Sequence, residues 1–137
     1  MLALDLGEVR IGVAVSDPDR RLAVPAGTIR VAGAPQDLRA VAGLVREHGA
    51  AEVVVGHPLT MAGERGEAAR RAEEFAAGLQ AILDVPVHLQ DERLSTVEAE
   101  RGLRAAGAGG RDRRAAVDQA AATLILRSFL DRSPREA

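Results

Sequence analysis

Residues 3–17 read Ala-Leu-Asp-Leu-Gly-Glu-Val-Arg-Ile-Gly-Val-Ala-Val-Ser-Asp, and the rest of the chain is organised around this stretch. It predicts an apolar strand that ends in Asp-Leu-Gly, a tight turn, and a second apolar strand from Ile11 to Val15. Asp5 alternates with leucines, so we expect it inside the first strand, near the middle of a sheet. A carboxylate there is costly to bury unless a metal ion or a hydrogen-bond network compensates it. An exposed hairpin whose acid only satisfies a turn fits this stretch equally well.

The composition excludes several classes of protein. The chain has 137 residues, which predicts a single domain over residues 1–137 with a sizeable core. It contains no Cys, so disulfides, thiolate nucleophiles and Cys-ligated zinc are ruled out. No apolar run approaches the ~20 residues of a membrane span, and the N-terminus lacks the layout of a signal peptide. We therefore expect a cytoplasmic protein without a membrane partner.

Basic charge is concentrated in one part of the chain. All 18 basic residues are arginines, and the net charge of −2 gives no general attraction to nucleic acid. Between residues 101 and 114, however, there are five arginines and a single acid, Asp112. These arginines are Arg101, Arg104, Arg111, Arg113 and Arg114. They could contact phosphates, although a solvated helix face would have the same composition.

The remaining elements follow from apolar spacing and from turn residues. We expect a strand over 22–31, at a sheet edge because of Pro25. A helix over 36–48 should end at Gly49. The next expected elements are a strand over 52–56, a helix over 67–83, a strand over 85–91, a helix from the capping box at Ser95 and Glu98 to about 106, and a last helix over 113–131. In the helix over 67–83, the expected buried stripe is Ala68, Ala72, Phe75, Leu79 and Ile82.

This order predicts an α/β fold. Three strands joined by short loops make an antiparallel meander, and the two strand-helix-strand units that follow add two parallel strands. The sheet is therefore expected to be mixed and five-stranded, with helices on both faces.

Three acids on separate elements are candidates for a metal site. They are Asp5 in the first strand, Glu92 or Asp91 at the end of the last strand, and Asp118 among apolar residues of the last helix. Hydrolysis of a phosphodiester by two metal ions needs carboxylates that converge in this way. Oxygen ligands alone favour Mg²⁺ or Mn²⁺. Asp118 could instead be an exposed acid that pairs with Arg114 one turn earlier.

Four blocks of sequence, in order, resemble the YqgF family (also called RuvX), pre-16S ribosomal RNA nucleases related to Holliday junction resolvases. The first block is Asp5-Leu6-Gly7 with residues 10–17, and the second is Gly56-His57-Pro58-Leu59 with Gly63 and Gly66. The third and most distinctive is Asp91-Glu92-Arg93-Leu94-Ser95-Thr96, and the fourth is Val117-Asp118-Gln119-Ala120-Ala121. The resemblance covers nearly the whole chain. The family usually has an apolar residue where this chain has His57, which we interpret as a rim residue.

The resemblance implies an RNase H-like fold and a divalent-metal-dependent endonuclease. Asp5, Glu92 and Asp118 would be the catalytic, metal-binding acids, with Glu92 preferred to Asp91 because it matches the acid of the family. Arg10 and Arg93 would position the scissile phosphate, or would serve as structural ion-pair partners. Ser95 and Thr96 could hold a phosphate oxygen at a helix start, although capping alone explains Ser95. Arg111 and Arg114 complete the expected substrate-binding residues.

The substrate implied is structured nucleic acid, either precursor ribosomal RNA during maturation of its 5′ end or branched DNA. The alternatives are a Holliday junction resolvase, which would act as a homodimer, and a non-catalytic nucleic-acid-binding or transcription-related module on the same fold. A sugar kinase or an Hsp70-type ATPase shares the Asp-x-Gly hairpin but needs two related domains, and this chain is long enough for one.

Overall fold

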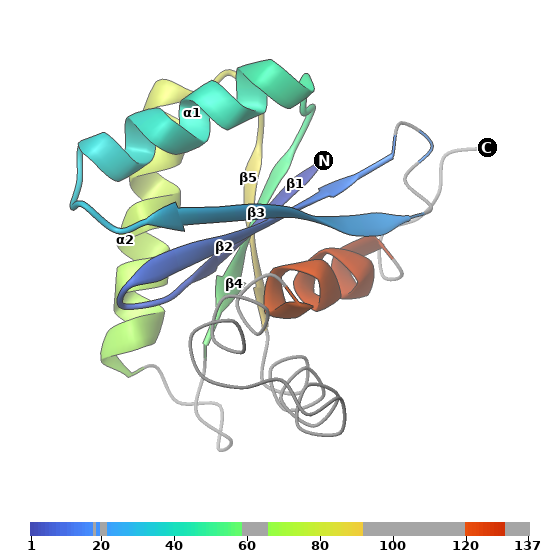
Figure 1. The fold of residues 1–137 in the computed structure, drawn as a ribbon. Helices are drawn as coiled ribbons and strands as arrows, with labels where there is room; N and C mark the ends of the chain where they lie inside the picture. Colours follow the sequence, from blue (N-terminus) through green and yellow to red (C-terminus); the bar gives the residue numbers. More distant parts are fainter. Residues whose placement is uncertain (18, 20–21, 59–65, 92–119, 131–137) are drawn as a thin grey trace.

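The computed structural model of the chain describes residues 1–17, 19, 22–58, 66–91 and 120–130 (Figure 1). The elements in chain order are β1 (Leu2–Leu6), β2 (Arg10–Ser16), β3 (Ala23–Arg30), α1 (Gln36–His48), β4 (Val53–His57), α2 (Glu67–Ile82) and β5 (Val87–Asp91). Residues 120–130 form a further helical segment. Within these ranges, no helix is long and apolar enough to cross a lipid bilayer.

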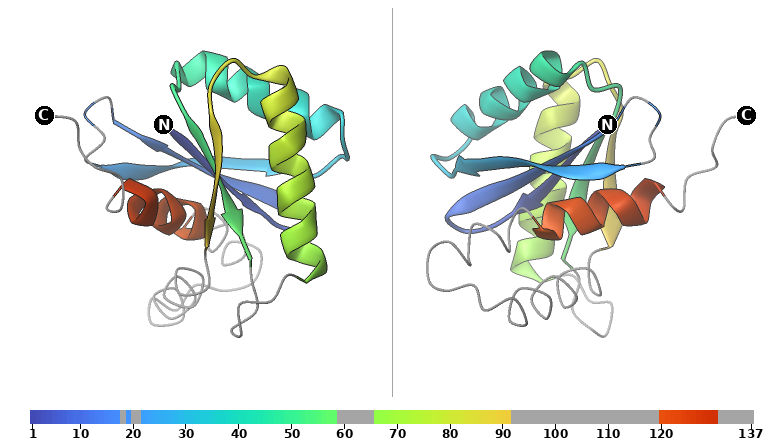
Figure 2. Two further views of the ribbon diagram at one scale, coloured as in Figure 1. Left: turned by 180° about the vertical axis from the view of Figure 1, so that it is seen from behind. Right: turned by 45° about the vertical axis from the view of Figure 1, so that its right-hand side comes forward.

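The strands form one mixed sheet in the order β3-β2-β1-β4-β5. β2 pairs antiparallel with β1 and β3, whereas β4 pairs parallel with β1 and β5. This is the five-stranded arrangement expected from the order of elements, and helices lie on both of its faces (Figure 2). Because β1 is the central strand, the structure confirms that Asp5 lies inside the sheet and not in an exposed hairpin.

A tight turn joins β1 to β2 and depends on Gly7. The Gly7 amide donates a hydrogen bond of 2.9 Å to the Arg10 carbonyl oxygen. A Cβ atom on Gly7 would lie 2.5 Å from that same oxygen, closer than van der Waals contact permits. Glycine is therefore required here for close approach of the backbone.

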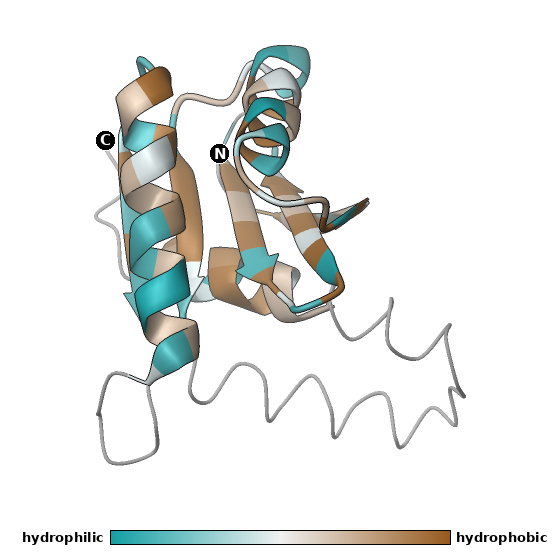
Figure 3. Ribbon diagram, turned by 90° about the vertical axis from the view of Figure 1, so that its left-hand side faces the viewer, coloured by the Kyte–Doolittle hydropathy of each residue, from teal (hydrophilic) through white to brown (hydrophobic). Residues whose placement is uncertain are grey.

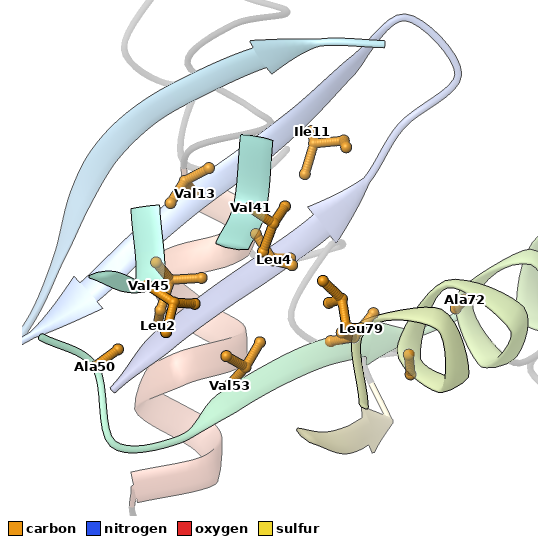
Figure 4. Close-up of a cluster of buried hydrophobic side chains, with 12 residues drawn as sticks. Leu2, Leu4, Ile11, Val13, Val41, Val45, Ala50, Val53, Ala72 and Leu79 are labelled. Atoms are coloured by element: carbon orange, nitrogen blue, oxygen red, sulfur yellow. The ribbon is translucent and has the colours of Figure 1, made fainter. Parts of the chain in front are cut away.

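Successive residues of each strand point to opposite faces of the sheet, and they contribute to two separate hydrophobic cores. On one face, Leu2 and Leu4 of β1 pack with Val41 of α1 and Leu79 of α2 (Figure 4). On the other face, the next residues along the strands meet the helix of residues 120–130. This second core contains Ala3, Ala14, Val54, Ala122, Ile125, Leu126 and Leu130. Small side chains on the strands let this helix lie close to the sheet.

The bounds of α1 match the expected helix, and Gly49 ends it. Gly49 adopts the left-handed conformation (φ 61°, ψ 36°), which a C-terminal glycine favours. Asp37, in the first turn, is only 5% exposed. Its two carboxylate oxygens accept hydrogen bonds of 2.9 and 3.0 Å from the amides of Ala32 and Gly33. This acid therefore fixes the segment between β3 and α1.

The expected buried stripe of α2 is confirmed at Ala72 and Leu79, and Phe75 packs against the first core, but the stripe was wrong at both of its ends. The buried residues are Ala69, Ala72, Ala76 and Leu79. Ala68 is exposed and Ile82 is 51% exposed. Figure 3 shows hydrophilic residues along much of the helices, whereas the strands are mainly hydrophobic.

Strands β2 to β5 each differ by one or two residues from expectation at their ends. β3 is an edge strand, as Pro25 predicted, and its pairing with β2 shifts between Val13 and Ala14. β5 begins at Val87, two residues later than expected. The side-chain amide of Gln80 accounts for the delay, since its nitrogen donates to the Val85 carbonyl and its oxygen accepts from the Val87 amide.

The helix of residues 120–130 is held to β5 by two side-chain contacts. Gln90 donates a hydrogen bond of 3.2 Å to the Ser128 hydroxyl, and the rings of His88 and Phe129 lie 5.1 Å apart. His88 therefore faces a helix. The expected helix over 95–106 and the first part of the one over 113–131 lie outside the described residues.

Candidate functional site

Asp5 lies near the end of the central strand and is half-buried. Neighbouring residues of a strand point to opposite faces of the sheet. Leu4 contributes to the core beneath α1 and α2, and Ala3 contributes to the core beneath the helix of residues 120–130. Asp5 therefore faces the same side as Ala3, at the margin of the second core.

Both strands beside Asp5 present a glycine to it. Gly12 of β2 is its direct cross-strand partner. The parallel register of β1 and β4 pairs Leu4 with Val55, so Gly56 comes next to Asp5 on the other side. Residues side by side in adjacent strands share a face, so neither adjoining strand places a side chain beside the Asp5 carboxylate. Both glycines are buried, and each allows other groups to approach the backbone of the sheet closely.

The registers extend this row across the whole sheet. From β3 to β5 it reads Thr28, Gly12, Asp5, Gly56 and Gln90. Thr28 and Gln90 are therefore the nearest side chains on either side of Asp5 within the row. Since Gln90 also bonds Ser128, the row ends directly against the helix of residues 120–130.

The carboxyl ends of β1, β4 and β5 meet at one edge of the sheet because these three strands are parallel. At that edge His57 of β4 lies beside Asp91 of β5. His57 points to α2, where its Nε2 lies 2.7 Å from Glu73 Oε2. Asp91 shares that face with His57, so its side chain lies on the side opposite to Asp5. Of the two acids left open by the sequence, Asp91 is therefore poorly placed to join Asp5.

His57 has a structural partner. Its side chain is only 18% exposed and that of Glu73 is 26% exposed. The pair joins the end of β4 to α2 on the face away from Asp5. The expectation of a rim residue is corrected in this respect, because the ring is held by α2.

Arg10 begins β2 and lies on the same face as Gly12 and Asp5, two residues from Gly12 along the strand. Directly across from Arg10, on β3, is Arg30. Neither guanidinium forms an ion pair or a side-chain hydrogen bond within the part of the chain that the structure describes. Two like charges directly opposite each other destabilise a sheet, so this arrangement favours an anion that binds both.

Sequence reasoning missed Arg30. The only signal was its place at the end of an expected edge strand, since the pairing with Arg10 requires the register of the hairpin. The other expected site residues lie outside the described residues and are Glu92, Arg93, Ser95, Thr96, Arg111, Arg114 and Asp118. Among the residues that are described, no three acids or histidines gather as a metal site would require.

Comparison with known proteins identifies the family. The family model described as "RuvX: Holliday junction resolvase" matches residues 1–132. The chain belongs to the RuvX family. The resemblance inferred from the four sequence blocks is thereby confirmed.

Several curated relatives of this RuvX chain carry the provisional name pre-16S rRNA nuclease. The protein from Mycolicibacterium paratuberculosis is 52% identical over 131 residues, which cover 95% of this chain and 78% of the relative. That from Thermobifida fusca is 49% identical, with 98% and 88% covered. That from Anaeromyxobacter dehalogenans is also 49% identical, with 96% of each chain covered.

Solved structures show that this RuvX chain has the RNase H-like fold of resolvases. RuvC of Thermus thermophilus in complex with a Holliday junction substrate superposes with a TM-score of 0.55 at 18% identity, over 96% of each chain. The fowlpox virus resolvase in complex with Holliday junction DNA also gives a TM-score of 0.55, at 10% identity, over 96% of this chain and 97% of the other. At these identities the likeness concerns the fold.

Proposed function

We propose that this RuvX chain is a divalent-metal-dependent endonuclease that hydrolyses phosphodiester bonds during maturation of the 5′ end of pre-16S ribosomal RNA. The observation that carries the proposal is the placement of Asp5, half-buried in the central strand and flanked by Gly12 and Gly56. A carboxylate in this position is compensated by hydrogen-bond partners or by a metal ion, and an oxygen ligand at the end of the central strand suits a hard divalent cation. The names of relatives about half identical to this chain support RNA as the substrate.

The proposed metal ligands are Asp5, Glu92 and Asp118, and the ion is Mg²⁺ or Mn²⁺. Glu92 is preferred because Asp91 lies on the other face of the sheet from Asp5. Asp118 precedes Ala121 and Ala122 by three and four residues; both alanines are buried, and Ala122 packs in the second core. An all-oxygen set of ligands suits these hard cations. The ions would polarise the scissile phosphate and lower the pKa of the attacking water.

The remaining residues would bind and orient the substrate. Arg10 and Arg30 present two guanidinium groups on the face of Asp5 and would hold phosphate oxygens by charge-assisted hydrogen bonds. Gly12 and Gly56 would let the sugar-phosphate backbone come close to the sheet. Beyond the described residues, the same role is proposed for Arg93, Ser95, Thr96, Arg111 and Arg114.

A cleavage assay tests the proposal. The wild-type protein is incubated with Mg²⁺ or Mn²⁺ and either a pre-16S 5′-end RNA or a four-way DNA junction, beside Asp5→Asn and a matched control, Asp19→Asn. Asp19 is an exposed acid of the turn between β2 and β3, so the same chemical change there should leave cleavage intact. We expect the RNA to be cleaved by the wild type and the control and to remain whole with Asp5→Asn. Binding without cleavage by the wild type would contradict an enzyme and indicate a nucleic-acid-binding module.

A second candidate function is resolution of Holliday junctions, which the description of the matching family and the folds of the solved neighbours favour. A junction is two-fold symmetric, so a resolvase needs two active sites in a symmetric dimer. Cleavage of the DNA junction alone, by a protein that sediments as a dimer, would establish this function in place of RNA processing.

A further inference from the structure

A hollow of about 280 Å³ lies on the face of the sheet opposite to Asp5. It opens between the turn after β1, the start of α1 and the first half of α2. Its apolar lining comes from side chains that also pack on the first core: Leu6, Ile11, Val31, Leu38 and Phe75. Phe75 is one of only two phenylalanines in the chain. The proposed nuclease reaction uses none of these side chains.

Charged groups surround this apolar floor. Glu8 comes from the turn, and Arg71 and Glu74 come from α2. All three are exposed, and none makes an ion pair or a side-chain hydrogen bond within the described part of the chain. Asp37 also lines the hollow, but its carboxylate already accepts bonds from two backbone amides. The rim therefore carries more negative than positive charge.

The volume of the hollow and the charge of its rim indicate what kind of group it binds. The hollow lies at the lower end of the range of about 300–1,000 Å³ found for sites that bind drug-sized ligands. A hollow of this size suits one large apolar side chain, the kind of anchor that dominates protein interfaces. The acidic rim repels phosphate groups, so a nucleotide or a nucleic acid strand is disfavoured. The same rim attracts Lys or Arg beside the anchor.

We propose that this hollow is a docking site for a partner protein, which inserts an aromatic or large aliphatic side chain flanked by basic residues. The site would be separate from the nuclease site, since the sheet lies between them. The chain could therefore hold a basic protein segment on one face while nucleic acid contacts the other. The proposal does not depend on the cleavage reaction.

The test uses the intrinsic fluorescence of a peptide. The chain contains neither Trp nor Tyr, so the emission of a single Trp in an added peptide reports its own burial. The full-length chain is titrated with acetyl-Gly-Ser-Lys-Trp-Lys-Ser-Gly-amide and with the same peptide carrying Glu in place of both Lys. We expect a blue shift on binding and a dissociation constant about fivefold lower for the basic peptide, as for two exposed charge pairs.

Two sets of variants locate the binding. Ala34 is an exposed residue of the lining, so Ala34→Phe should fill the hollow and weaken binding at least tenfold. Ala77→Phe adds the same side chain to an exposed position of α2 outside the lining and should bind like the wild type. Glu8→Arg combined with Glu74→Arg should reverse the preference, so that the acidic peptide binds more tightly.

Three results would overturn the proposal. They are no blue shift with either peptide, equal loss of binding in Ala34→Phe and Ala77→Phe, and a preference for the basic peptide that survives the double charge reversal. Circular dichroism of each variant confirms that the chain is folded before the titration. Neither the titration of the wild type nor that of the variants uses the cleavage assay, so failure of the docking proposal is distinguishable from failure of the nuclease proposal.

Discussion

At the scale of single residues, glycines decide what the site can do. Gly12 leaves the position across from Asp5 without a side chain, and Gly7 allows the turn that brings β2 alongside β1. The sequence places Gly7 two residues after Asp5 and Gly12 in the second expected strand. It did not distinguish their roles, since that required the register of the hairpin.

Gly12→Ala should impair catalysis without unfolding the chain. A methyl group beside the Asp5 carboxylate would occupy the room proposed for the cation and the phosphate, so we expect cleavage to fall at least tenfold. Gly12 is itself buried, so the urea midpoint is measured beside cleavage, and we expect cleavage to fall by more than the change in stability explains. The matched control is Gly43→Ala in α1, where a Cβ atom would have nothing within 4 Å. Full activity of Gly12→Ala would show that Asp5 needs no such room.

Gly7→Ala should do the reverse and lower stability first. Its Cβ atom would lie 2.5 Å from the Arg10 carbonyl oxygen, so the turn must shift. We expect the free energy of unfolding in urea to fall by about 1–3 kcal/mol, as for other overpacked sites. An unchanged urea midpoint would mean that the turn can relax without cost.

At the scale of elements, the sequence predicted α1 well because apolar spacing and Gly49 agree at its ends. It placed the two ends of the buried stripe of α2 wrongly because alanines occur around this helix, and small side chains do not indicate which side is buried. The sequence also did not indicate on which face of the sheet Asp91 lies, since Gln90 and Asp91 are both polar. The bond from Gln90 to Ser128 and the pairing of Asp91 with His57 decide it.

The contact between β4 and α2 can be measured by a double-mutant cycle. His57→Ala and Glu73→Ala, alone and together, should give a coupling free energy of about 1 kcal/mol for this hydrogen-bonded pair. The cycle separates the pair from any other contact of Glu73. Cleavage should stay within about twofold of wild type, because His57 faces away from Asp5. A loss of cleavage much greater than the loss of stability would indicate that His57 acts in the reaction.

At the scale of the whole molecule, charge is distributed unevenly. The net charge of −2 repels nucleic acid at long range, so binding must come from arginines gathered locally. The sequence revealed the group between residues 101 and 114. It could not reveal Arg10 beside Arg30, because twenty residues separate them and only the pairing of β2 with β3 brings them together.

Removing both arginines should therefore change the salt dependence of binding. For the variant with Arg10→Ala and Arg30→Ala, we expect weaker binding to the RNA. The slope of log affinity against log salt should be shallower by about 1.4–1.8, as for two lost phosphate contacts. Arg39→Ala with Arg46→Ala removes two exposed arginines of α1 and is the matched control. If both double variants show the same slope, the Arg10 and Arg30 pair does not contact phosphate.

The two cores of the sheet are completed at different times during synthesis. Residues 1–91 supply all five strands and both helices of the first core, whereas the helix that covers the second core comes from residues 120–130. At the ~5–20 residues per second of translation, this interval lasts about 2–8 s. During it the nascent chain lacks the helix that packs on Ala3, Ala14 and Val54. A chain that stops early would therefore be a substrate for chaperones and proteases, and not a partly active enzyme.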